Sequence, residues 1–102
     1  MVWTVLDTKE LQKVSAVLSA LGSPIRLKIV ELVRQTEKPL HIKAVAQALK
    51  KDYAAVYRHI KVMEKSGLVG VHEVGRSRVI YLKNADLITE FVRLAQKMLQ
   101  TH

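Results

Sequence analysis

The spacing of hydrophobic residues changes twice along the chain, and each change marks a change of secondary structure. From residue 8 to residue 66, apolar side chains recur every three or four positions in four successive runs, which predicts four helices. After Gly67 the period falls to two over 68–74 and 79–82, which predicts two strands joined by the tip Gly75-Arg76-Ser77-Arg78. The helical period returns over 85–100. The predicted order is four helices, a hairpin and a last helix.

Capping residues set the expected bounds of these helices. Polar N-cap types precede four of the five runs: Asp7 with Glu10 in capping-box position, Ser23 followed by Pro24, Asp52, and Asn84. Gly22 is expected to end the first helix, and Ser66-Gly67-Leu68 is expected to end the fourth in a Schellman-type turn. The terminal helices are thereby placed at about 8–21 and 85–100.

The middle of the chain carries two short helices in close succession. The third helix, over 42–49, follows the short extended piece Leu40-His41, and the turn Lys50-Lys51-Asp52 separates it from a fourth helix at about 53–66. A basic hairpin at about 69–82 comes directly afterwards. This order predicts one domain over 1–102, mainly α with a two-stranded β-wing: a winged helix-turn-helix with additional N- and C-terminal helices.

Net charge is concentrated in that middle block. The chain carries 17 Lys and Arg against 9 Asp and Glu, a net charge of +8. Residues 38–83 hold ten of the basic and three of the acidic residues, which gives this segment +7. Because phosphate contacts supply most non-specific affinity for nucleic acids, a cationic helix and hairpin indicate a double-stranded DNA partner.

The fourth helix has two faces of opposite character, and the cationic face supplies the first candidate contacts to DNA. Val56, Ile60 and Met63 form an apolar stripe that must be buried, and the basic residues of the helix fall opposite it. Arg58 suits bidentate contact with guanine or phosphate, whereas Lys61 suits phosphate alone. The full predicted DNA-binding set is Lys43, Lys50, Lys51, Tyr53, Ala54, Ala55, Tyr57, Arg58, Lys61, Lys65, Arg76 and Arg78.

Each member of this set also has a purely structural interpretation. A solvated surface helix carries lysines too, and a hairpin tip carries exposed arginines. Tyr53 and Tyr57 either reach bases or phosphates or cover the edge of the core with their hydroxyls in water. Ala54 and Ala55 either permit close approach to thymine methyl groups or simply favour the helix.

Three stretches of this sequence together resemble the ArsR-type winged-helix transcriptional repressors. They are Leu21-Gly22-Ser23-Pro24-Ile25-Arg26-Leu27-Lys28-Ile29-Val30-Glu31-Leu32-Val33, then Val56-Tyr57-Arg58-His59-Ile60-Lys61-Val62-Met63, and Lys65-Ser66-Gly67-Leu68-Val69. In order, they look like the family's second helix, its recognition helix and the entry to its wing. The resemblance implies a homodimer that binds a pseudo-palindromic operator near a promoter, with the terminal helices at the interface.

The positions at which many members of this family bind metal are changed. Where a cysteine pair begins the third helix in relatives, this chain has His41 and Lys43. A second family site on the last helix keeps only Asp86, with Ile88, Lys97 and Gln100 at the partner positions and His102 at the terminus. A charged lysine has no lone pair for a metal, and the four histidines share no ligand spacing, so no metal site and no cofactor are predicted.

The apolar surface of the terminal helices exceeds what one core of about 100 residues needs. The first, second and last helices all present broad apolar faces, and Trp3, Val5 and Leu6 add to them. An isologous homodimer would bury this surplus. The alternative is that the ends of the chain wrap around their own domain.

Several other classes of protein are disfavoured. No apolar run of 18 residues spans a membrane, no secretory pattern opens the chain, and the absence of cysteine excludes disulfides and zinc ribbons, so a cytoplasmic, nucleoid-associated protein is expected. No paired carboxylates, cysteine nucleophile or glycine-rich phosphate loop indicates an enzyme. No residue pattern identifies an effector.

The sequence therefore favours a homodimeric, sequence-specific DNA-binding transcriptional regulator, most simply a repressor. One alternative is a sequence-indifferent architectural protein of chromatin. The other is a protein-interaction winged helix whose basic face docks an acidic partner.

Overall fold

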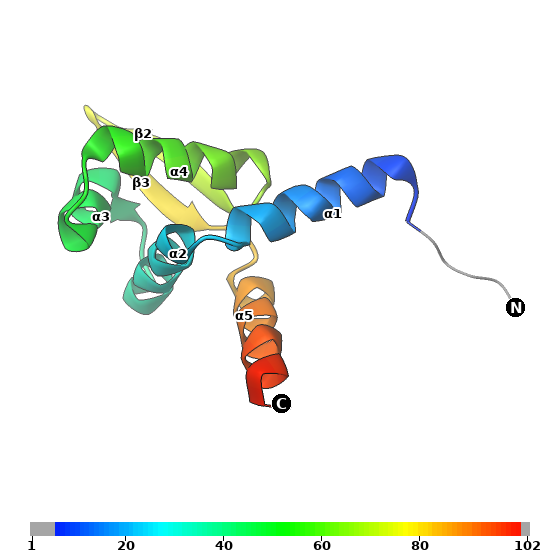
Figure 1. The fold of residues 1–102 in the computed structure, drawn as a ribbon. Coiled ribbons are helices and arrows are strands. Elements are labelled where there is room, and N and C mark those ends of the chain that lie inside the picture. The colour runs from blue at the N-terminus through cyan, green and yellow to red at the C-terminus, as the bar shows by residue number, and fades with distance from the viewer. Residues whose placement is uncertain (1–5, 101–102) are drawn as a thin grey trace, which may run out of the picture.

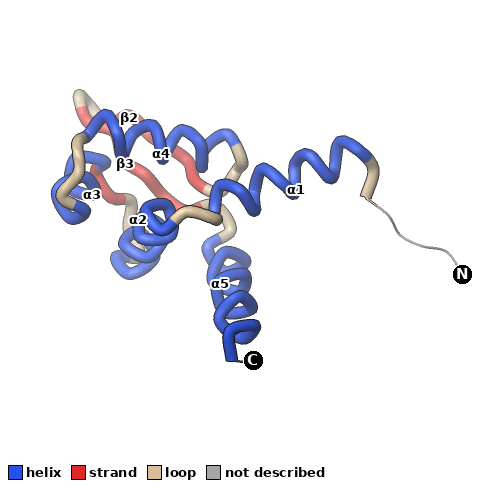
Figure 2. The backbone as a smooth tube through the Cα atoms, viewed as in Figure 1, coloured by secondary structure: helices blue, strands red, loops and turns tan. Residues whose placement is uncertain are grey.

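A computed structural model describes residues 6–100, and the described part of the chain contains five helices and a three-stranded sheet (Figures 1 and 2). The elements follow in this order: α1 (Thr8–Leu21), α2 (Pro24–Thr36), β1 (Leu40–His41), α3 (Ile42–Leu49), α4 (Tyr53–Lys65), β2 (Val69–Val74), β3 (Ser77–Leu82) and α5 (Ala85–Gln100). The predicted winged helix-turn-helix with an added helix at each end is confirmed. Trp3, Val5 and His102 lie outside the described residues.

The first two helices begin where their capping residues predict. The Oδ1 of Asp7 accepts a hydrogen bond from the Glu10 N–H at 2.8 Å, and Ser23 Oγ accepts from the Arg26 N–H at 3.3 Å with Pro24 at N1. Gly22 ends α1 as expected, but at φ −80° and not in the left-handed conformation of a C′ glycine. The reason is that the chain must enter the extended N-cap of α2 at the very next residue.

Two other caps differ from the prediction. Asp52 occupies the N-cap position of α4 in extended conformation, but its side chain makes no capping bond, and the exposed end of the helix leaves its first N–H groups to water. Asn84 lies at φ 53°, where its backbone carbonyl accepts from the Leu87 and Ile88 N–H groups. Asparagine tolerates this left-handed conformation, which turns the chain out of β3 into α5.

The sheet has three strands, so the prediction of a two-stranded wing is incomplete. The strand order is β1-β3-β2, all antiparallel, and β1 pairs Leu40 with Ile80 and His41 with Val79. Proline before Leu40 and the extended conformation of His41 align this short segment with the free edge of β3.

The hairpin tip is shorter than predicted. Val74 pairs with Ser77, so the turn is only Gly75-Arg76, and Ser77 and Arg78 belong to β3. A positive φ of 61° at Gly75 fits the first position of a II′ turn, which glycine adopts without strain. The longer strands extend the wing and fix Arg78 directly opposite Glu73.

The core lies between the helices α2, α3 and α4 and the inner face of the sheet. The stripe predicted for α4 is confirmed, because Val56, Ile60 and Met63 are fully buried. Their buried partners come from α1, α2, α3, the turn after α4, the sheet and α5: Ala20, Leu21, Ile29, Val30, Val33, Ile42, Val45, Ala46, Leu68, Val69, Ile80 and Ile88. One continuous core therefore fixes α4 to the rest of the domain.

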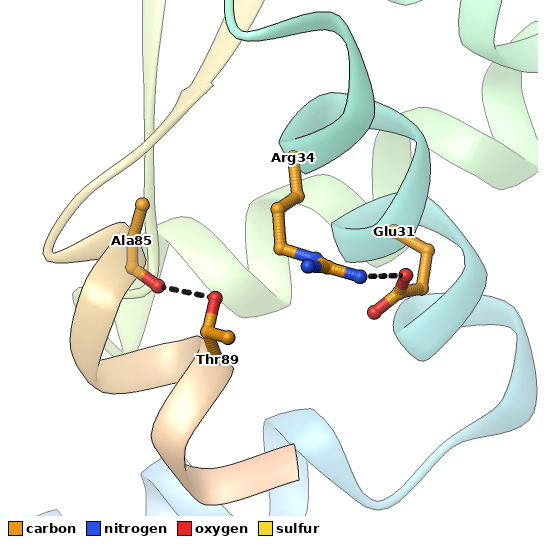
Figure 3. Close-up of polar contacts among 4 residues, drawn as sticks. All are labelled: Glu31, Arg34, Ala85 and Thr89. Carbon is orange, nitrogen blue, oxygen red and sulfur yellow. Dashed lines mark hydrogen bonds and ion pairs between the residues drawn. The ribbon is translucent and has the colours of Figure 1, made fainter. Parts of the chain in front are cut away.

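Helices α1 and α5 project from this body, in different directions (Figure 1). The radius of gyration is 15.3 Å, larger than the ~13 Å typical of a compact domain of this size. Ile88 is the only buried residue of α5 in its described length. Where α2 and α5 face each other, Arg34 pairs with Glu31 and the Thr89 hydroxyl donates to the Ala85 carbonyl, so each helix satisfies its own polar groups (Figure 3).

Candidate nucleic-acid interface

The turn between α3 and α4 holds its lysines in a defined conformation. The Lys51 N–H donates to the Ala46 carbonyl at 3.0 Å and the Lys50 N–H to the Gln47 carbonyl at 3.2 Å, the two bonds of a Schellman motif. Lys50 takes the left-handed position of that motif, at φ 55°. Glycine is the usual residue there, as Gly67 is at the end of α4 with φ 85°. Lys50 adopts this conformation, which is strained for a residue with a side chain, and its positive charge lies beside the start of α4.

Replacing Lys50 by glycine is expected to raise the free energy of unfolding by up to about 1 kcal/mol, because the left-handed strain is released. The same change should weaken DNA binding, because a cation beside α4 is lost. Lys51→Gly is the matched control: it removes the same charge from a residue with negative φ and should lower stability. Urea unfolding of the three proteins checks this, and a destabilised Lys50→Gly would contradict it.

The predicted cationic face of α4 is exposed along its length. Ala54, Arg58, Lys61 and Lys65 are all exposed, on the side away from the buried stripe. Arg58 makes no hydrogen bond or ion pair with any other described residue. Lys61 instead donates to Glu64 at 2.7 Å, and this hydrogen bond raises the pKa of Lys61. Arg58 is thus the guanidinium on this face that is free to meet a ligand.

The wing and α4 meet through aromatic and cationic side chains. Tyr53 and Tyr57 stack with ring centroids 6.1 Å apart, and the Arg78 guanidinium lies 4.7 Å from the centroid of the Tyr57 ring. Arg78 also faces Glu73, its partner across the strands, at 3.9 Å. The nearby side chain of Tyr53, and after it that of Tyr57, raises the pKa of Arg78. Tyr57 and Arg78 therefore fix the wing relative to α4, in addition to any contact with DNA.

A cleft of about 550 Å³ lies between α3, the first residue of α4 and the wing. Its basic lining residues are Lys43, Arg76 and Arg78, and Gln47, Ser77 and Tyr53 add hydrogen-bonding groups. The structure thus brings Lys43 from α3 together with both wing arginines and Tyr53. This cleft has the charge and the polar groups to hold a phosphate backbone.

The twelve predicted residues therefore lie on one surface in three parts. The stripe on α4 contributes Ala54, Arg58, Lys61 and Lys65. The turn contributes Lys50 and Lys51, and the cleft contributes Lys43, Tyr53, Arg76 and Arg78. Ala55 and Tyr57 are only partly exposed, at the edge of this surface. We name this whole set the basic face.

Arg26 is a neighbour of the basic face that the sequence did not single out. Its Nε donates to the Ala20 carbonyl at 2.7 Å, and a second nitrogen donates to the Ser19 carbonyl at 3.3 Å. A third nitrogen lies 3.1 Å from Nδ1 of His59 on α4. Because an arginine only donates, Nδ1 of His59 must be the acceptor, in the neutral ring. His59, which is itself only partly exposed, thus has a specific partner on α2.

The stability of the fold should depend on pH through His59. Burial and then the charge of Arg26 lower the pKa of His59 from its ordinary 6.5. Below about pH 6.5 the unfolded chain therefore takes up a proton more readily than the folded chain does. The free energy of unfolding is highest above this pH and decreases as the pH drops below it. In urea unfolding, the free energy of unfolding should decrease more steeply with falling pH in the wild type than in His59→Gln. Equal decreases in the two proteins would contradict this role of His59.

The two sets of positions that bind metal in relatives lie in separate parts of the fold. His41 lies at the edge of the wing cleft, and Asp86 lies at the start of α5 beside Arg34 and Lys38. Within residues 6–100, no three His, Asp or Glu side chains are grouped so that they could hold a metal ion. No described helix is long and apolar enough to cross a membrane.

Solved structures of similar shape are winged-helix regulators. The homodimeric winged helix-turn-helix DNA-binding domain Mb0332 from Mycobacterium bovis, a possible ArsR-family regulator, superimposes with a TM-score of 0.80. It is 23% identical, and the match covers 99% of this chain and 96% of that one. Five helices with a basic wing on a helix-turn-helix give this protein the same winged helix-turn-helix fold as these ArsR-family regulators.

Curated relatives carry the same regulator designation. The HTH-type transcriptional regulator NmtR of Mycobacterium tuberculosis is 34% identical over 77 residues, which cover 76% of this chain and 62% of that protein. The uncharacterised HTH-type transcriptional regulator MJ1325 of Methanocaldococcus jannaschii is 24% identical over 87 residues, or 85% of this chain and 96% of its own. The family model described as HVO_A0114 matches residues 21–87, and the chain belongs to that family.

Proposed function

We propose that this protein is a homodimeric, sequence-specific, double-stranded DNA-binding transcriptional regulator that acts by binding and not by catalysis. The observation that carries the proposal is the basic face: helix stripe, turn and wing cleft lie next to one another, and Arg58 projects without an internal partner. In this reading α4 enters the major groove, Arg58 with Tyr53, Ala54 and Ala55 reads bases, and Lys61 and Lys65 contact phosphates.

The wing cleft would hold the flanking backbone. Lys43, Arg76 and Arg78 carry the positive charge, and Arg76 at the turn has the reach for the minor groove or the next phosphate. The exposed N–H groups at the start of α4, which Asp52 leaves uncapped, add donors for a phosphate. These groups position the protein, whereas Arg58 supplies selectivity.

A homodimer is supported by the exposed apolar side chains of the projecting helices. On α1 these are Leu11, Val14 and Leu18, and on α5 they are Leu87, Phe91, Leu94, Met98 and Leu99. Apart from Leu99, each set recurs at three- or four-residue spacing, so it forms a continuous face that a second copy can bury. The similar Mycobacterium bovis domain is described as homodimeric. Two copies of α4 would then meet successive major grooves.

We further propose that this regulator represses. A dimer spanning two grooves at a promoter occupies the DNA that a polymerase needs, so binding alone reduces transcription. An in-vitro transcription assay on a promoter that carries the preferred site should show fewer transcripts as the protein is added. More transcripts would indicate an activator.

Duplex titrations at several salt concentrations separate DNA binding from the protein-interaction alternative. Between about 50 and 200 mM salt, log K should fall linearly with log salt, by ~0.9 per phosphate contacted. Lys51→Ala and Arg76→Ala should each weaken all sequences alike and reduce that slope by ~1. Lys97→Ala, which removes a lysine near the far end of α5, is the control and should leave the slope unchanged. No binding at the lowest salt would favour docking of an acidic protein partner.

A further inference from the structure

One side chain joins the dimer helix α1 to the proposed recognition helix α4. Arg26 lies in the first turn of α2 and donates hydrogen bonds to two other helices. It donates to the carbonyls of Ser19 and Ala20 at the end of α1, and to Nδ1 of His59 on α4. Arg26 is only partly exposed, and Ala20 is fully buried. We name this set of contacts the Arg26 bridge.

The bridge adds donors at the C-terminal end of α1, where the Ser19 carbonyl also accepts from the Gly22 N–H at 3.2 Å. The last carbonyls of a helix lack partners within it and carry partial negative charge, which a cation satisfies. The last turn of α1 contains no basic residue. Arg26 supplies the cation from the next helix, and the Ser23-Pro24 start of α2 holds it at that distance. The orientation of α1 is therefore tied to Arg26.

The other end of the bridge lies beside the residue proposed to read bases. His59 is adjacent to Arg58 and sits between the exposed stripe of α4 and its buried stripe. A hydrogen bond at this position adds, at the edge of the buried stripe, to the restraint that the core packing of Val56, Ile60 and Met63 places on rotation of α4 about its own axis. A small rotation of the helix would displace every base contact on its outer face.

We propose that Arg26 is a positioning residue for DNA recognition, holding α4 at the angle that the dimer helix α1 dictates. The proposal rests on the function proposed above. The Arg26–His59 contact also responds to pH. A proton on Nδ1 of His59 removes the hydrogen-bond acceptor and places a second positive charge against Arg26, so the bridge opens. Arg58 and Lys51 also face His59 and add to that repulsion. Acidification should therefore reduce selectivity between sequences, even as added positive charge strengthens non-specific binding.

The test measures the ratio of affinities for the duplex recovered by selection and for a scrambled duplex, from about pH 8 to about pH 5.5. Arg26→Gln should lower this ratio by about 10-fold, His59→Ala by a similar factor, and the double variant by no more than either. His59→Gln keeps a neutral acceptor, so its ratio should match the wild type at high pH and stay flat on acidification, whereas the wild-type ratio falls.

Two results would overturn the proposal. If Arg26→Gln lowers the free energy of unfolding but leaves the ratio and its pH dependence unchanged, the bridge is only structural. If the losses from Arg26→Gln and His59→Ala add, His59 contacts DNA directly and Arg26 does not act through it.

An NMR titration of the His59 ring in the DNA-free protein separates this proposal from the proposed function. Removing the Arg26 charge should raise the pKa of His59 towards its ordinary value, with or without any DNA. An unchanged His59 pKa in Arg26→Gln would show that the bridge is not formed, whatever the protein binds. If His59 responds as expected but no duplex binds, the proposed function fails, and the positioning role fails with it.

Discussion

Replacing Arg58 by alanine is expected to weaken binding to the preferred operator by about 1–3 kcal/mol and to relax sequence preference at one position of each half-site. The guanidinium is exposed on the outer face of α4 and has no hydrogen bond or ion pair within the described chain, so it is available to a guanine edge. For the same reason its loss should change the free energy of unfolding by less than about 0.5 kcal/mol. Titration of the operator and of single-base variants measures both effects.

Arg93→Ala is the matched control for this experiment. Arg93 is also exposed, but it lies on α5, which projects away from the basic face (Figure 1). Its removal should leave selectivity intact. If Arg58→Ala keeps wild-type affinity and selectivity, α4 does not read DNA in the proposed orientation.

Placing a charge on the apolar face of α5 should have an equally large effect, but on assembly. Leu94 is 49% exposed in the single chain and lies on the stripe with Phe91. In a dimer, Leu94→Glu would bury a carboxylate and lose an apolar contact, which should raise the dimer dissociation constant by about 100-fold or more. A dimer binds both half-sites of the operator at once, whereas a monomer binds only one, so operator affinity should fall by ~10² or more. Analytical ultracentrifugation and operator titration check the two consequences.

The control for this change carries the same charge on the opposite side of the helix. Gln96 is two residues from Leu94 and therefore faces away from the stripe, so Gln96→Glu should leave the dimer and its DNA affinity unchanged. A Leu94→Glu protein that remains dimeric would place the interface elsewhere. If the wild type is a monomer at high concentration, the alternative that the terminal helices serve only their own domain becomes the better account.

Much of the fold follows from local signals in the sequence. Ser23-Pro24 starts α2, and Ser66-Gly67-Leu68 ends α4 with the two predicted bonds, Gly67 N–H to Glu64 and Leu68 N–H to Met63. Both depend on residues within five positions of each other, so sequence spacing is enough to find them.

Other features depend on pairs far apart in sequence. The β1 strand has two residues, too few for any period, and forms only because β3 offers an edge 38 to 40 positions later. His41 and Val79 form one of the two pairs that build it, and their spacing carries no signal.

The same limit applies to the candidate site. All twelve predicted residues carried a local signal: charge, aromaticity or a place on the outer face of α4. Arg26 on α2 contacts His59 on α4 across 33 positions, and Arg78 on the wing contacts Tyr57 on α4, so neither contact was predictable from local spacing. The strain at Lys50 was hidden as well, because a lysine gives no sign of a left-handed backbone.

In-vitro selection of bound duplexes from a random pool tests the central claim most directly. A homodimer that presents two copies of α4 should enrich a pseudo-palindrome whose half-sites are about one helical turn apart, roughly 10 base pairs or a multiple of it. The same selection with Arg58→Ala should give a motif degenerate at one position in each half-site. A pool that remains random while binding stays tight would contradict sequence-specific regulation and would support the architectural alternative.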